Sequence, residues 1–267
     1  MMWRNRKLYV LLSLSVSAML FSGCTKEVSR DISRATGEIA TEVVKDAISY
    51  KIDEILLNRA ESMLSSSENA SDPDKYPTEP VEGTYSELNG NVPYFTATEI
   101  QSGSEAFENY SEQDELGRCG VAFANIFPEL MPDEERGEIG MVKPTGWKQA
   151  KYPELIEGAG YLYNRCHLIA FELAGENANE KNLITGTRAF NLNMLPFENK
   201  VAQYVRETGH HVLYRVSPDF RGDELVARGV TIEAMSVEDN GCVFCVYIPN
   251  VQPGITIDYN TGRSEKA

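Results

Sequence analysis

The sequence predicts an α+β fold with a mainly antiparallel sheet, preceded by a long amphipathic helix. Three observations lead to this prediction: a periodic segment near the N-terminus, several short strand-like runs in the second half of the chain, and one clear helix among those runs. The composition is that of an ordinary globular protein, since 42% of the 267 residues are hydrophobic and 24% are charged. Fibrous, collagen-like and wholly disordered proteins are therefore excluded.

Residues 1–23 have the features of a secretory signal peptide. Basic residues precede an apolar run from Leu8 to Leu20, and the small residues Ser22 and Gly23 follow it. Small residues directly before Cys24 resemble the lipobox of bacterial lipoproteins, in which the cysteine becomes the lipidated first residue of the mature chain. We therefore expect lipidation of Cys24 and a membrane as a partner through that lipid. The alternative is a plain signal peptide or an uncleaved anchor, and either version places the protein outside the cytoplasm, membrane-anchored or secreted.

The next two segments predict a tether and a linker. Residues 24–64 form the tether, because apolar residues recur over 28–63 at steps of mostly three or four, as in one long amphipathic helix. Its apolar stripe could pair with another helix, lie on a membrane or fold back on the domain. Residues 65–82 are rich in serine, proline and acidic residues, which predicts a flexible linker. The remaining residues, 83–267, suffice for one sizeable domain.

Within this domain, short runs of β-branched and aromatic residues predict strands. They occupy residues 160–163, 211–216, 226–234 and 242–248. One helix precedes the last three: Pro196 suits its first turn, apolar residues follow at helical spacing, and Gly209 is placed to end it.

Histidine is the side chain that titrates near neutral pH, and the chain contains three. His210 and His211 directly follow Gly209, and favourable electrostatic interaction with the helix C-terminus explains histidines at these positions without a catalytic role. His167 is different, because it stands two residues after Arg165, and two residues apart means one face of a strand. A base beside a fixed positive charge suits phosphoryl chemistry, in which a water loses a proton while charge grows on phosphate oxygens. His167 is therefore the candidate base, with a buried core histidine as the alternative.

A long, multi-part pattern surrounds His167. It comprises residues 176–188, Asn191 and 194–199, together with 117–120, 143–147, 250–254 and 258–262. These stretches closely resemble bacterial DNA/RNA non-specific endonucleases of the DNA-entry nuclease type, which belong to the His-Me finger, or ββα-metal, group. The resemblance covers most of the predicted domain and implies a ββα-metal catalytic core within the α+β fold.

The resemblance also implies roles for single residues. His167 matches the general base, and Asn191 matches the one direct protein ligand of a magnesium ion, for which manganese can substitute. The family's Asp-Arg-Gly-His motif is Asn164-Arg165-Cys166-His167 here, which keeps the arginine and the histidine. Glu198 matches a helix glutamate that holds water around the metal. The stretch between Asn191 and Met194 is one residue shorter than the family pattern, so Asn193 competes with Asn191 as the ligand.

This chemistry is consistent with the residue types. Magnesium prefers oxygen ligands and keeps most of its water, so an amide oxygen, a water-holding carboxylate and a substrate phosphate can complete its coordination. Neutral His167 would deprotonate the attacking water, and Arg165 would offset charge on the phosphorus. The resemblance implies products with 5′-phosphates.

The net charge limits how a nucleic acid could bind. It is −15 for the whole chain, and residues 83–267 hold 15 Lys and Arg against 27 Asp and Glu, a balance of −12. Contact with a polyanion must therefore be local. Three windows, 139–153, 158–171 and 181–197, contain no acidic residue. Apart from Arg165, they supply the predicted substrate-binding cations Lys143, Lys148, Lys151, Lys181 and Arg188.

The cysteines allow two further hypotheses. Cys242 and Cys245, with the two neighbouring histidines, could bind zinc, but a spacing of three on a strand sends the sulfurs to opposite faces. Cys119 and Cys166 could form a disulfide in an oxidising compartment, with buried free thiols as the alternative.

Taken as a whole, the sequence favours an extracytoplasmic, metal-dependent endonuclease that cuts DNA, with RNA as a further candidate substrate. The alternative is a non-catalytic module that keeps the nuclease fold and only binds nucleic acid at a surface, and a toxin domain is a third possibility. No oligomeric state is predicted.

Overall fold

The computed structural model describes residues 76–77, 83–104 and 106–267. The chain divides into two units, residues 1–64 and 65–267, and all described residues belong to the second. The predicted signal peptide, Cys24 and the predicted helix over 28–63 lie outside the described residues, as does most of the predicted linker. Among the residues described, no helix is both long enough and apolar enough to span a bilayer.

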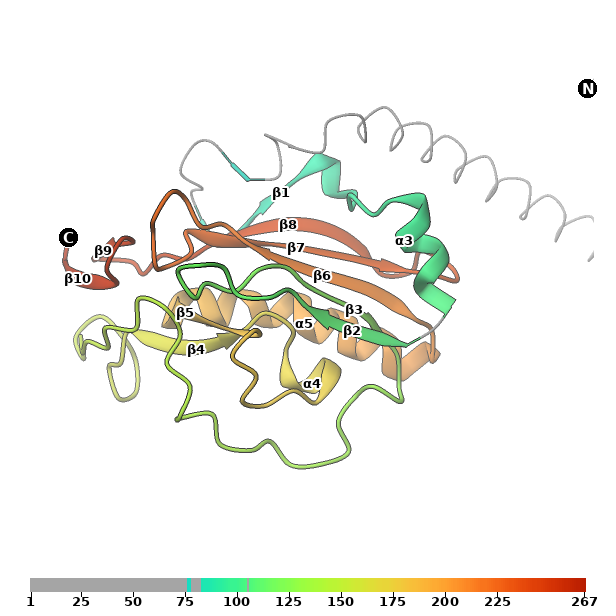
Figure 1. Ribbon diagram of the computed structural model, residues 1–267, viewed down its shortest axis with the longest axis horizontal. Helices are drawn as coiled ribbons and strands as arrows, with labels where there is room; N and C mark the ends of the chain where they lie inside the picture. Colours follow the sequence, from blue (N-terminus) through green and yellow to red (C-terminus); the bar gives the residue numbers. More distant parts are fainter. Residues whose placement is uncertain (1–75, 78–82, 105) are drawn as a thin grey trace, which may run out of the picture. The chain divides into compact units, whose positions relative to one another are not determined.

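A six-stranded sheet, antiparallel throughout, forms the centre of the domain (Figure 1). Its strand order is β1-β8-β7-β6-β3-β2. The strands are β1 Ser86–Glu87, β2 Phe107–Tyr110, β3 Ala122–Ile126, β6 Val212–Pro218, β7 Gly229–Ser236 and β8 Val243–Pro249. The predicted class, α+β with a mainly antiparallel sheet, is confirmed, and the strands predicted after residue 210 are β6, β7 and β8.

Two separate hairpins complete the strands. β4 Tyr163–His167 pairs with β5 Leu183–Thr187, and β9 Ile255–Asp258 pairs with β10 Arg263–Lys266. The strand predicted over 160–163 was misplaced, because Gly160 adopts a left-handed φ of 72° and the regular strand begins only at Tyr163. As a result His167 is itself the last residue of a strand.

One long helix, α5 Arg188–Thr208, dominates the helical part (Figure 1). The shorter ones are α3 Ala97–Gln101, α4 Phe171–Ala174 and the 3-10 turns η1 Asn89–Asn91 and η2 Ser102–Ser104. The predicted start of the long helix at Pro196 was wrong. The helix begins eight residues earlier, where the Thr187 hydroxyl accepts a hydrogen bond from the Phe190 N–H (3.0 Å) and caps it. Gly209, with a φ of 71°, ends the helix as predicted.

The main core lies between α5 and one face of the sheet. Buried side chains of α5, among them Phe190, Met194 and Val201, belong to one hydrophobic cluster with Tyr214 and Phe244 of the sheet. The cysteines are part of this interior: Cys119, Cys166, Cys242 and Cys245 are all buried and not joined in disulfides, which agrees with the alternative of buried thiols.

The opposite face of the sheet is covered by the segment that leads into α3. Phe95 packs there with Leu213 and Met235 in a second cluster. The fully buried Glu233 accepts a hydrogen bond from the Tyr94 N–H (2.6 Å) and pairs with Arg215 (2.8 Å). This N-terminal segment is therefore part of the domain.

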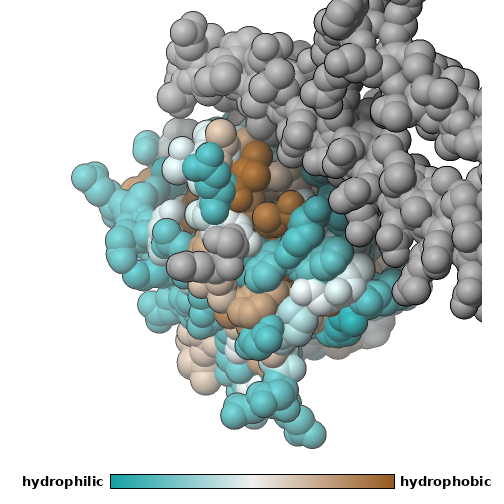
Figure 2. Space-filling view, turned by 90° about the vertical axis from the view of Figure 1, so that its right-hand side faces the viewer, coloured by the Kyte–Doolittle hydropathy of each residue, from teal (hydrophilic) through white to brown (hydrophobic). Residues whose placement is uncertain are grey.

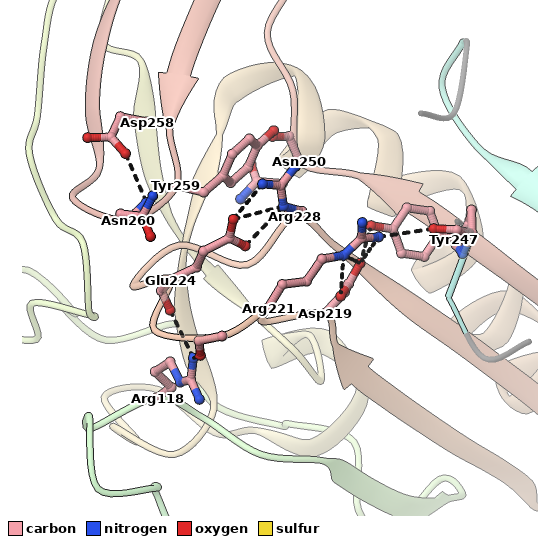
Figure 3. A network of polar contacts seen from close by, with 12 residues as sticks. Arg118, Asp219, Arg221, Glu224, Arg228, Tyr247, Asn250, Asp258, Tyr259 and Asn260 are labelled. Atoms are coloured by element: carbon pink, nitrogen blue, oxygen red, sulfur yellow. Dashed lines mark hydrogen bonds and ion pairs between the residues drawn. The ribbon is translucent and has the colours of Figure 1, made fainter. Parts of the chain in front are cut away.

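Two residues of the predicted linker also contact the domain. The Tyr76 hydroxyl donates to the carbonyl of Pro218 (3.1 Å), and Arg221 donates to the carbonyl of Pro77 (3.0 Å). Arg221 is itself held by Asp219, which also accepts a hydrogen bond from Tyr247 (Figure 3). Contacts with the domain thus begin before residue 83.

Hydrophilic residues cover most of the described surface on the side shown in Figure 2, with hydrophobic residues visible in smaller areas between them.

Candidate active site

The hairpin β4–β5 and the helix α5 form one compact unit, because Arg188, the first residue of α5, directly follows the last residue of β5. Gly186 of β5 makes their close packing possible: a Cβ at this position would collide with the sulfur of Cys166 and the ring of Phe190. Two paired strands followed by a long helix, with the short α4 inserted between the strands, give the ββα arrangement that the resemblance implied (Figure 1).

His167 ends β4 and is almost completely buried, with 6% of its surface exposed. Its Nε2 lies 2.8 Å from the carbonyl oxygen of Asn177, and its Nδ1 lies 3.2 Å from Nη2 of Arg136. A carbonyl can only accept and a guanidinium can only donate, so these partners assign the proton of the neutral ring to Nε2 and the lone pair to Nδ1. Burial lowers the pKa of His167, and Arg136 lowers it further, while the bond to Asn177 opposes both. The ring is therefore neutral at neutral pH, and Nδ1 is the atom that can take a proton.

Arg136 was not predicted as a site residue. It lies on an exposed loop between β3 and β4, and the neighbouring Gly137 donates its N–H to the side-chain oxygen of Asn177 (2.7 Å). Asn177 thus holds the His167 ring through its own carbonyl and the Arg136 loop through its side chain. Arg136 stands among Asp133, Glu134, Glu135 and Glu138, so it lies outside the acid-free windows of the sequence.

Asn191 and Glu198 lie on the same face of α5. Seven residues of an α-helix turn through 700°, which leaves the two side chains only about 20° apart around the axis. Asn193 is turned by about 160° from Asn191 and by about 140° from Glu198. The stretch from Asn191 to Met194, which is one residue shorter than the family pattern, is regular helix and contains no loop. The helix therefore groups Glu198 with Asn191 and separates it from Asn193.

Glu198 is a buried acid with 6% of its surface exposed. No residue of the described ranges donates a hydrogen bond to its carboxyl group or forms an ion pair with it. Burial, and to a smaller extent the nearby Glu172, raise the pKa of Glu198, while Arg136 acts in the opposite direction; the net pKa is about 8. Arg136 thus acts electrostatically on both Glu198 and His167.

These residues fit a hydrated divalent cation. The amide of Asn191 and the carboxyl of Glu198 offer oxygens that are not bound by other described residues. The side-chain nitrogen of Asn164 is buried without a hydrogen-bond partner among the residues described, and strand alternation puts Asn164 on the same side of β4 as Cys166, facing α5. Water held around a cation could bond to such a group. The described residues contain no group of three His, Cys, Asp or Glu side chains that could hold a metal.

The Arg165 side chain makes its contacts within the protein. Its guanidinium donates to the carbonyl oxygens of Val142 and Gly140 and lies 4.4 Å above the ring of Trp147. Arg165 thus holds the loop that carries Lys143 and Lys148, and the guanidinium beside His167 in this structure belongs to Arg136.

The predicted substrate-binding cations fall into two groups. Lys143, Lys148, Lys151 and Arg188 are exposed, and none forms an ion pair with a described acid. Lys181 differs, since its ammonium group pairs with Glu112.

The chain is also similar to known proteins. The family model described as DNA/RNA non-specific endonuclease matches residues 97–238. The crystal structure of NucA from Streptococcus agalactiae with magnesium bound is similar, at 27% identity and a TM-score of 0.61 over 70% of this chain and 90% of that one. The Sda1 nuclease with bound zinc has 26% identity and a TM-score of 0.52, over 60% of this chain and 82% of that one.

A curated sequence relative is a deoxyribonuclease from Streptococcus dysgalactiae subsp. equisimilis, 32% identical over 108 residues. The match covers 38% of this chain and only 32% of that protein, so the chain spans about a third of this relative.

Proposed function

The chain belongs to the DNA/RNA non-specific endonuclease family, and on this premise we propose that it is a magnesium-dependent endonuclease that hydrolyses DNA and also RNA, leaving 5′-phosphates. The observation that carries the proposal is the pairing of a neutral, buried His167 with the guanidinium of Arg136, which also acts electrostatically on Glu198, on the face of α5 that carries Asn191.

His167 acts as the general base in this proposal. Its Nδ1 takes the proton of the attacking water, and the Asn177 carbonyl, by accepting from Nε2–H, fixes the ring and favours the imidazolium that forms. In the structure Arg136 donates to the same Nδ1. A phosphate is a stronger partner for a guanidinium than a neutral imidazole, so a substrate phosphate would draw Arg136 away and free the lone pair. Arg136 would then offset charge on the phosphate as the P–O bond breaks.

Asn191 and Glu198 would hold the metal. Magnesium, when bound, polarises the phosphate and stabilises the leaving oxygen. The Asn191 amide supplies the direct ligand, and the Glu198 carboxylate orients water around it. The magnesium ion in the similar NucA structure supports magnesium as the natural metal, although zinc is bound in Sda1; manganese is a proposed substitute.

Substrate contact is proposed for the exposed cations Lys143, Lys148, Lys151 and Arg188. Lys181 would contribute less to substrate binding, because it is already ion-paired. Arg165 contributes by holding the loop of Lys143 and Lys148, which modifies the direct role expected for it.

The protein is proposed to act outside the cytoplasm, attached to a membrane through a lipidated Cys24 or secreted. This part rests on the signal-like N-terminus. Mass spectrometry of the mature protein from a bacterial membrane fraction would test it. An N-terminal residue other than a lipidated Cys24 would contradict the anchor.

Incubation of the purified chain with plasmid DNA and with RNA, in magnesium or in chelator, tests the activity. We expect cleavage only with magnesium, and 5′ ends that carry phosphate when the products are end-labelled. A shift of the substrate in a gel without any cleavage would instead favour the non-catalytic binding module.

The metal ligand is tested by Asn191→Ala with Asn193→Ala as its matched control on the same helix. Loss of the ligand should lower activity and move the magnesium titration to higher concentration for Asn191→Ala only. If Asn193→Ala is the damaging change, the assignment of Asn191 is wrong.

A further inference from the structure

Tyr161 exposes its ring at the edge of the catalytic hairpin. The side chain is 46% exposed and stands two residues before β4, the strand that ends in His167. The ammonium group of Lys151 lies 4.2 Å from the centre of the ring. A partly exposed aromatic ring and a positive charge are thus presented side by side.

The backbone fixes this pair in place. Lys151 and Tyr161 form an isolated antiparallel bridge, and hydrogen bonds on both sides of it join Tyr152 to Gly160 (2.8 Å) and Leu162 to Ala150 (3.0 Å). The loop that connects Lys151 to Tyr161 is anchored to the interior, since its Ile156 is buried in a small hydrophobic cluster with Leu162. The backbone that carries the ring is therefore held in place, so that little backbone freedom is lost when a ligand covers the ring.

The surroundings are cationic although the domain is acidic. The backbone N–H of Arg188 donates to the carbonyl of Leu162 (2.8 Å), which brings the exposed Arg188 close to Tyr161 in the fold. Lys148 stands three residues before Lys151, and Glu154, on the loop between Lys151 and Tyr161, is neutralised by an ion pair with Lys266. Glu157, exposed on the loop, is the remaining acid there. Such an arrangement suits a ligand that is both flat and negatively charged.

We propose that Tyr161 and Lys151 form a stacking site for an unpaired nucleobase, with Lys151 and Arg188 near its phosphates. The ring can stack only on a base whose face is open, and in a duplex each face is covered by a neighbour. The site therefore favours single-stranded nucleic acid. Six residues of extended chain separate Tyr161 from His167, about 20 Å at roughly 3.3 Å per residue, so the stacked base lies several nucleotides from the cut. This inference rests on the proposed nuclease function.

Binding in chelator tests the site without cleavage. A single-stranded oligonucleotide that carries the fluorescent base 2-aminopurine, and a duplex of the same sequence, are titrated with the full-length chain, with Tyr161→Ala and with Tyr161→Phe. Stacking on an aromatic side chain quenches this fluorophore. We expect Tyr161→Ala to weaken single-strand binding about tenfold and to abolish the quenching, with duplex binding within about twofold of the unmodified protein. Tyr161→Phe keeps the ring and should behave like the unmodified protein.

Tyr85→Ala is the matched control, because Tyr85 is equally exposed (45%) but has its ring against Phe197. It should leave single-strand binding unchanged. The proposal is overturned if Tyr161→Ala binds like the unmodified protein, if it loses single-strand and duplex binding alike, or if Tyr85→Ala has the same effect. Cleavage in magnesium is measured separately, so a protein that stacks bases without cutting would contradict the proposed function and leave the stacking site supported.

Discussion

Glu198 shows how a single residue can serve a site at a cost to the fold. Its carboxyl is buried, lacks a hydrogen-bond partner among the described residues and has its pKa raised to about 8. In the unfolded chain the same group ionises near its ordinary value of 4.5. Between these two values the folded state holds a proton that the unfolded state has released. Stability contributed by the protonated form is therefore lost as the pH rises from about 4.5 to about 8.

Glu198→Gln should consequently stabilise the metal-free protein. Glutamine cannot ionise, so the variant avoids a cost of about 3 kcal/mol at neutral pH, as an order of magnitude. Urea unfolding in chelator measures it: the variant should be more stable at pH 8 and nearly equal to the unmodified protein at pH 4, while losing activity in magnesium. Glu207→Gln, exposed on the same helix, should show no such pH dependence. A Glu198→Gln variant that is less stable at pH 8 contradicts this account.

Single residues also mark the limit of prediction from sequence. His167, Asn191 and Glu198 could be proposed because each lies within a continuous motif. Arg136 precedes His167 by 31 residues in an acidic segment, and the hydrogen bond between Gly137 and Asn177 helps to hold it beside the ring. No local pattern encodes such a contact, since it depends on how a long loop closes.

At the scale of elements, α5 explains both a success and an error. Its apolar spacing and Gly209 were enough to predict the helix and its end. Its start was wrong because proline is typical of a first turn, whereas Pro196 is the ninth residue of α5. The Thr187 cap and the packing of Phe190 on the hairpin outweigh the cost of an internal proline. Packing between elements thus decided a boundary that local propensity could not.

Pro196→Ala should therefore stabilise the protein, by about 1–3 kcal/mol, because it restores a backbone donor for the carbonyl of Leu192. Thermal unfolding measures the gain. Asn199→Ala, exposed on the same helix, reports the smaller effect of helix propensity alone. Equal gains from both variants would mean that the helix starts near Pro196 after all.

For the whole molecule, the local charge around the proposed site differs in sign from the net charge of the chain. The chain has a net charge of −15, yet four exposed cations without acidic partners among the described residues, Lys143, Lys148, Lys151 and Arg188, lie on segments around the hairpin and α5. The general fold class followed from the sequence because alternation and turns repeat along the strands. Which cations are already ion-paired could not be predicted, since the pairing of Lys181 with Glu112 joins residues 69 positions apart.

The salt dependence of DNA binding tests this division. With about five phosphate contacts, from these four cations and Arg136, the logarithm of the binding constant should fall with the logarithm of salt concentration by a slope no steeper than roughly −5. Lys148→Ala should reduce the slope by about one, whereas Lys181→Ala should change it little, because Lys181 is already paired. Equal effects of the two variants, measured by fluorescence anisotropy in chelator, would contradict a local cationic surface.

The central claim is that His167 activates the attacking water, and the turnover of His167→Ala on plasmid DNA in magnesium tests it most directly. DNA affinity and thermal stability of the same preparation serve as controls. We predict a turnover lower by a factor of about 10²–10⁴, with affinity nearly unchanged, because only the proton acceptor is removed. A folded His167→Ala variant that cuts DNA at the rate of the unmodified protein would contradict the account.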